Sequence, residues 1–305
     1  MKIVTGGAPF IDIDAYGCIL AYTELLNKQN IEAIAFTTSR YNESITGTVQ
    51  SWRAIPRNYK INPEDTFIVL DASNPNCIEK IVSIDRLEMV VDHRSEFVDA
   101  WQQTGVEPRI EKIGAAATYI FEQWELAGLT SVISLASARL LYTAIIDNTL
   151  NLQSKVTTNR DRRAYEHLRR LAKLPKNWPE TYFKEVEKVI LTDVINAINS
   201  DTKLYASPNM QKQLTFMQLC VWDIEEFIQT ILGTLNSNKN IAEPWLMNLI
   251  AIKQKRSYFL ADSSPTAEWL HESLGLKKTS KNVYMAKRMY LQKEVIEKDR
   301  KRAIK

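Results

Sequence analysis

Short apolar runs recur along the first half of the chain, and each one stops at polar or acidic residues. Predicted strands cover residues 2–5, 32–36, 66–70 and 87–91. The length of these runs and their β-branched side chains are typical of buried parallel strands. Helical periodicity fills the intervals, most clearly after Asp14 and over residues 131–146. This half is therefore predicted to alternate strands and helices.

The second half carries fewer and more mixed elements. Strands are predicted over 214–222 and 246–252, and helices over 224–235 and 266–274. With 305 residues the chain exceeds the roughly 100–200 typical of one domain. We expect an α/β protein with two domains, residues 1–190 holding a parallel sheet and residues 191–305 forming a smaller mixed α/β domain.

Chemically active side chains follow four of the apolar runs. They are Asp12 and Asp14, Asp71, the triplet Asp92, His93 and Arg94, and the pair Asp147 and Asn148 after the run 144–146. Carboxyl ends of parallel strands are where open α/β sheets bind ligands, so these side chains are expected to share one site. Any one of them could instead be a helix cap or turn residue. Two carboxylates one residue apart repel each other unless a cation lies between them, which favours a metal site.

Composition limits the classes of protein. Hydrophobic residues at 45% and charged residues at 25% are ordinary for a soluble globular chain. A net charge of +3 does not require a polyanionic partner, and nucleic acid could bind only through the basic stretch 277–305, which makes such a partner unlikely. The three cysteines lack metal-ligand spacing, and no run is long enough to span a membrane. We expect a cytoplasmic protein without a membrane partner.

In their order and spacing, the acidic motifs resemble those of the DHH phosphoesterases, specifically the branch with a second associated domain. That branch holds manganese-dependent (family II) inorganic pyrophosphatases, exopolyphosphatases and prune-like proteins. The segment 12–14 resembles the first motif, Asp71 the second, 92–94 the third and 147–150 the fourth. Segments 201–203 and 286–288 resemble parts of the associated domain.

The resemblance implies an active site in the cleft between the two domains, with two divalent ions, most simply Mn²⁺, with Mg²⁺ or Co²⁺ as alternatives. The implied metal ligands are Asp12, Asp14, Asp71, His93 and either Asp147 or Asn148, with Asp71 bridging the two ions. The implied catalytic residues are Asp71, Asp92, His93 and Arg94. The implied substrate ligands are Arg94, Lys203, Lys287 and Arg288, the last three clamping phosphate from the second domain.

Three positions depart from the pyrophosphatase pattern. Ala8 stands where a metal-binding histidine is expected, and Arg94 replaces the last histidine of the third motif. In the fourth motif an ungapped match places Asn148 on the ligand position, whereas a shift by one residue would place Asp147 there. Asn can offer a carbonyl oxygen to a hard cation, but it supplies no charge.

The resulting hypothesis is a divalent-metal-dependent phosphohydrolase that cleaves the phosphoanhydride of pyrophosphate or short polyphosphate with a metal-activated water. One alternative is a phosphodiesterase acting on a nucleotide or short oligonucleotide. Another is a catalytically degraded binding or regulatory homologue. A homodimer is compatible with the sequence.

Overall fold

The computed structural model describes residues 1–94, 97–101, 104–225, 227–238, 241–280 and 282–303. The chain divides into two compact units, Met1–Pro179 and Glu180–Lys305. The sequence placed the boundary near residue 190, whereas the units meet near the start of helix α6 (Trp178–Thr192). Helical periodicity marks where a helix ends, but it does not show which unit the helix packs with.

A parallel five-stranded sheet forms the first unit, in the order β3-β1-β5-β6-β7. Its strands are β1 (Lys2–Thr5), β3 (Ala33–Ala35), β5 (Thr66–Leu70), β6 (Leu87–Asp92) and β7 (Arg109–Ile110). A small parallel pair, β2 (Phe10–Ile11) and β4 (Arg40–Tyr41), lies beyond the end of β1. All four strands predicted in this half are present, within one or two residues of the predicted ends.

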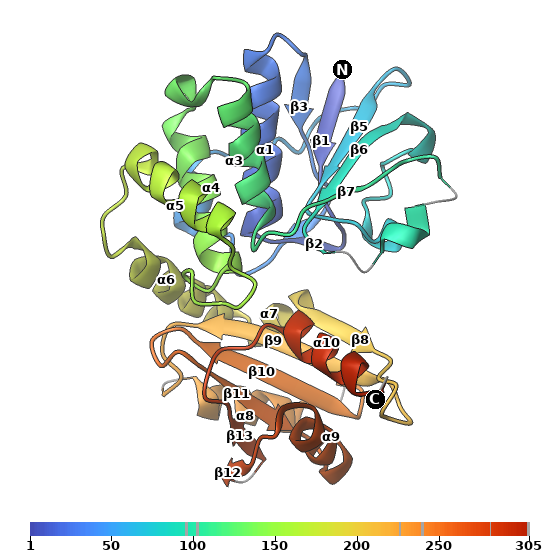
Figure 1. Cartoon of the computed structure of the whole chain (residues 1–305), viewed down its shortest axis with the longest axis vertical. Helices are drawn as coiled ribbons and strands as arrows, with labels where there is room; N and C mark the ends of the chain where they lie inside the picture. The colour runs from blue at the N-terminus through green and yellow to red at the C-terminus, as the bar shows by residue number, and fades with distance from the viewer. Residues whose placement is uncertain (95–96, 102–103, 226, 239–240, 281, 304–305) are drawn as a thin grey trace. The chain divides into compact units, whose positions relative to one another are not determined.

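The longer helices of this unit gather on one side of the sheet (Figure 1). The unit's helices are α1 (Ile13–Lys28), α2 (Gly47–Trp52), α3 (Ala116–Leu126), α4 (Leu135–Asn148) and α5 (Asn159–Ala172), with short 3₁₀ turns at 75–77, 84–86, 98–101 and 130–132. Helix α1 packs against α3 and α4. A Cβ at Gly17 would lie 3.3 Å from the backbone of Leu140, so glycine permits this close approach of α1 to α4.

A mixed sheet forms the second unit, in the order β12-β13-β11-β10-β9-β8. Only β9 and β10 run parallel to each other among the described strand pairs of this sheet. The elements are α7 (Val194–Ser200), β8 (Thr202–Tyr205), β9 (Leu214–Val221), α8 (Ile228–Ser237), β10 (Trp245–Ala251), β11 (Arg256–Ala261), α9 (Ser264–Leu274), β12 (Lys278–Ser280), β13 (Val283–Met285) and α10 (Gln292–Ala303). The fold is thus α/β with a parallel sheet and a separate mixed sheet, as the sequence predicted.

Two details differ from the sequence prediction. The run 144–146, grouped above with the strand-like runs, lies inside α4, and this helix begins at Leu135 because Ser134 caps it by accepting the N–H of Ser137. The sequence analysis did not predict strands β2, β4, β7, β8, β11, β12 and β13. Within the described residues, no helix is both long and apolar enough to cross a membrane.

Candidate metal centre

The parallel sheet reverses its strand order at β1 and β5. The chain leaves β1 toward β3 on one side, and leaves β5 toward β6 on the other. Such a reversal leaves a crevice at the carboxyl ends of the two strands, where open α/β sheets bind ligands. Asp71 directly follows β5, His93 directly follows β6, and the segment after β1 leads to Asp12 at the start of α1.

Asp14, Asp71 and His93 lie together at this edge. One potential ligand atom from each residue lies within 4.8 Å of those of the other two. Nε2 of His93 is 3.5 Å from Oδ1 of Asp71, and both side chains are almost fully buried. Carboxylate oxygen and imidazole nitrogen are suitable donors for Mn²⁺ and similar ions.

The Asp14 carboxylate is completely buried at the N-terminus of α3. It accepts the backbone N–H groups of Ala116 and Ala117, each at 2.8 Å. Burial, followed by the charge of Asp12, raises the pKa of Asp14 to about 7 despite these hydrogen bonds. A bound cation would have the opposite effect and favour the ionised carboxylate.

The orientation of His93 leaves Nε2 available as a ligand. Nδ1 lies 3.3 Å from the carbonyl oxygen of Ile113, which can only accept a hydrogen bond. Nδ1 therefore carries the proton in the neutral ring, and the lone pair is on Nε2, the nitrogen that faces Asp71. Metal-binding histidines are commonly held in this way by a backbone carbonyl.

Asp71 is held in an unusual backbone conformation. Its φ angle is +55°, a left-handed value that a non-glycine residue rarely adopts. Its N–H donates to the carbonyl oxygen of Val91 at 2.8 Å, which ties the turn to β6. Burial raises the pKa of Asp71 well above its usual value, partly offset by Arg94. Strained backbone of this kind concentrates at functional sites.

Arg94 joins Asp71 to the neighbouring Asp92. Its Nη2 donates to the carbonyl oxygen of Asp71 at 2.6 Å and to the Asp71 carboxylate at 3.1 Å, while its Nε donates to the Asp92 carboxylate at 3.0 Å. Burial opposes ionisation of Asp92, but the charge of Arg94 and the hydrogen bond donated by the N–H of His93 outweigh it and lower the pKa of this carboxyl. The same carboxylates raise the pKa of Arg94, although burial opposes this shift. Both partners are therefore charged.

Asp161 supports the centre, and the sequence analysis did not identify it. This completely buried carboxylate accepts the N–H of Gly114 at 2.9 Å, the hydroxyl of Thr118 at 2.6 Å, and the N–H of Thr158 at 2.7 Å. It thereby fixes the turn whose atoms contact His93 and Asp14. A Cβ at Gly114 would lie 2.8 Å from Thr149 and 3.1 Å from Asp161, so only glycine fits. The spacing Thr-x-x-Asp at 158–161, which forms a capping box, was the available signal.

The other predicted ligands lie outside this three-residue cluster. Asp12 caps α1 by accepting the N–H groups of Asp14 and Ala15, each at 3.0 Å. Asp147 and Asn148 are the last two residues of α4, and Nδ2 of Asn148 is buried without a hydrogen-bond partner among the described residues. Their roles as metal ligands stay predictions.

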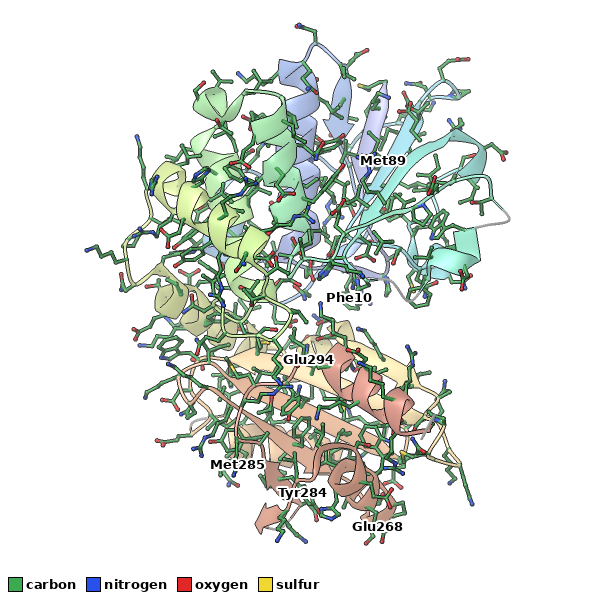
Figure 2. The ribbon with its side chains drawn as sticks, viewed as in Figure 1. Phe10, Met89, Glu268, Tyr284, Met285 and Glu294 are labelled. Carbon is green, nitrogen blue, oxygen red and sulfur yellow. The ribbon has the colours of Figure 1, made fainter. Side chains whose placement is uncertain are left out.

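The predicted phosphate ligands of the second unit are Lys203, Lys287 and Arg288. Lys203 lies on β8, and both lysine side chains are exposed. Arg288 lies 3.5 Å above the ring of Tyr290 and forms a 2.8 Å ion pair with Glu294, which Figure 2 labels on α10. Phosphate binding by these three residues stays a prediction.

Several proteins of known description are similar in sequence to this chain. The chain is 26% identical over 224 residues to a candidate manganese-dependent inorganic pyrophosphatase of Clostridium acetobutylicum, an alignment that covers 71% of this chain and 69% of the relative. A Lactobacillus helveticus protein with the same description is 28% identical over 53% of this chain and 52% of its own length. The chain is thus similar in sequence to proteins described as manganese-dependent inorganic pyrophosphatases. No protein-family profile matches it.

Solved structures support the relationship at the level of fold. A candidate family II inorganic pyrophosphatase of Methanococcus jannaschii superposes with a TM-score of 0.70 over 99% of both chains, at 17% identity. An exopolyphosphatase-related protein of Bacteroides fragilis superposes with a TM-score of 0.52 over 100% of this chain and 91% of its own, at 13% identity. The fold of this chain is thus similar to that of these two solved structures.

Proposed function

We propose that the chain is a metal-dependent phosphohydrolase that cleaves the phosphoanhydride bond of pyrophosphate or a short polyphosphate. The observation that carries the proposal is the cluster of Asp14, Asp71 and His93 at the switch point of the sheet, with Nε2 of His93 3.5 Å from the Asp71 carboxylate. The pyrophosphatase relatives support the same reaction class. A nucleotide or short oligonucleotide stays the alternative substrate.

The donor set fits a hard or borderline divalent ion. Asp14, Asp71 and His93 would hold Mn²⁺, with Mg²⁺ or Co²⁺ as alternatives, and the neighbouring Asp12 would add negative charge. A bound ion of this kind lowers the pKa of a coordinated water and polarises a phosphoryl oxygen. The contacts of Asp14 with α3 and of His93 with Ile113 hold the donors in place before the ion binds.

Arg94 has two functions in this proposal. It fixes Asp71 and Asp92 by the hydrogen bonds described above, and a third of its side chain is exposed. The exposed part of the planar guanidinium is suited to a phosphate oxygen. Lys203, Lys287 and Arg288 would add positive charge from the second unit, in agreement with the family resemblance.

Phosphate release from pyrophosphate and tripolyphosphate, and mononucleotide release from a dinucleotide, each with added Mn²⁺, test the proposal. The Asp71→Asn variant should lose at least about 100-fold in kcat/KM, equivalent to about 2.7 kcal/mol of transition-state stabilisation. Asp85→Asn is the matched control because it changes an exposed carboxylate of the same unit. Preferred turnover of the dinucleotide, or equal rates in Asp71→Asn and wild type, would contradict the proposal.

The remaining parts of the hypothesis are a cytoplasmic location and a homodimer. Both stay predictions.

A further inference from the structure

We infer that this chain holds a single divalent ion, at Asp14, Asp71 and His93, and that the guanidinium of Arg94 takes the place of a second ion. The inference rests on the metal dependence proposed above. It concerns how positive charge is distributed around Asp71, the residue that the family resemblance makes the bridge between two ions.

Asp71 already has a cation on one side. Its Oδ1 lies 3.1 Å from Nη2 of Arg94 and 3.5 Å from Nε2 of His93. An ion bound between Asp71 and His93 would therefore share this carboxylate with the guanidinium. The bridging carboxylate still joins two positive centres, but one of them belongs to the protein.

Arg94 is anchored at this position from several sides. Nη2 also donates to the carbonyl oxygen of Asp71 at 2.6 Å, and Nε lies 3.0 and 3.2 Å from the two carboxylate oxygens of Asp92. Asp92 is in turn buried and accepts the N–H of His93 at 2.7 Å. These hydrogen bonds hold the guanidinium beside Oδ1 of Asp71, so a positive charge already lies next to the carboxylate that a second ion would share.

Few side chains remain that could bind a second ion. Ala8 offers only a methyl group where the pyrophosphatase pattern has a histidine. Oδ1 of Asp12 is engaged by the N–H groups of Asp14 and Ala15. Over the part of the chain that the structure describes, the three residues of the proposed site form the one group of His, Cys, Asp or Glu donors close enough to hold an ion.

The permanent positive charge of Arg94 also disfavours a second divalent ion at this site. An arginine side chain keeps its proton at every physiological pH, so its positive charge cannot leave the site. Asp12, Asp71 and Asp92 all interact electrostatically with Arg94. A second divalent ion beside the guanidinium would meet a like charge and a carboxylate that is already paired. The substitutions at positions 8 and 94 thus act together: one removes a ligand, and the other supplies the missing charge.

The number of ions can be measured without any hydrolysis assay. We would dialyse the metal-free protein against Mn²⁺, determine manganese per chain by elemental analysis, and record the electron paramagnetic resonance spectrum. Wild type should bind one ion with the resolved hyperfine pattern of an isolated Mn²⁺. The double variant Ala8→His with Arg94→His should bind a second ion and show a spectrum broadened by spin coupling. Arg170→His, on the exposed face of α5, controls for binding by an added surface histidine.

Two coupled ions in wild type would overturn the inference, and so would the absence of any bound ion. A double variant that folds, as judged by its circular dichroism, yet still binds one ion would overturn the assignment of Arg94 as the substitute. If the double variant does not fold, the wild-type count and spectrum decide the matter alone. A wild type that binds one isolated ion but releases no phosphate would refute the proposed hydrolysis and leave this inference intact.

Discussion

Replacing Asp161 by alanine should destabilise the protein and weaken its metal site together. The change leaves the buried N–H of Gly114 without a partner, which costs about 1–3 kcal/mol. It also removes the half of the capping box that Asp161 supplies, while Thr158 still caps α5, at a further cost of about 0.5–1 kcal/mol. The sum is about 1.5–4 kcal/mol, against a typical total stability of about 5–15 kcal/mol. The variant should therefore fold, but with a much smaller margin.

Urea denaturation of the metal-free proteins measures the free energy of unfolding. The control is Asp193→Ala, which removes an exposed helix cap whose side chain accepts one N–H, that of Asn196, at 3.0 Å and should cost about 1 kcal/mol. A Mn²⁺ titration of both variants provides the second measurement. Because Asp161 fixes the turn that contacts Asp14 and His93, its loss should weaken manganese binding about 10–100-fold. A loss of stability no larger than that of Asp193→Ala, with unchanged affinity, would refute this reasoning.

Three further changes test other contacts. Asp65→Asn should lower the free energy of unfolding by about 1–3 kcal/mol at pH 7, because Asp65 accepts hydrogen bonds from Tyr59 and Asn62. These bonds lower the pKa of Asp65 although burial opposes them, so the difference in unfolding free energy from wild type should shrink below about pH 4. A difference that stays constant with pH would contradict this. Arg94→Lys should lower kcat/KM for pyrophosphate at least about tenfold because one ammonium cannot bond Asp71 and Asp92 as the fork does, and an unchanged value would exclude that role. Asp299→Ala should speed proteolytic removal of α10, because this buried carboxylate accepts hydrogen bonds from four side chains. An unchanged digestion rate would show that other contacts hold the helix.

The strand ends were predictable because they follow from local sequence. Apolar runs of four to six residues that stop at Asp71 or at Asp92 define both the strand and the point where it leaves the sheet. The alternation of such runs with helices then implies a parallel sheet, and a parallel sheet brings its carboxyl ends to one edge. The meeting of Asp14, Asp71 and His93 at one edge follows from these two steps.

The contacts that tune the centre were not predictable in this way. Asp14 is held by N–H groups more than 100 positions later in the chain, and Asp161 reaches Gly114 across 47 positions. Periodicity and spacing carry no information about such pairs. The run 144–146 shows a related limit: a short apolar segment does not distinguish a strand from a buried helix, and tertiary packing makes it part of α4.

Phosphate release from pyrophosphate by the protein before and after removal of bound metal tests the central claim most directly. Protein treated with a chelator and dialysed should release no phosphate above the buffer rate, and added Mn²⁺ should restore hydrolysis in proportion to the ion bound at Asp14, Asp71 and His93. Hydrolysis that persists in the metal-free protein, or that stays absent after Mn²⁺ has bound, would contradict the account.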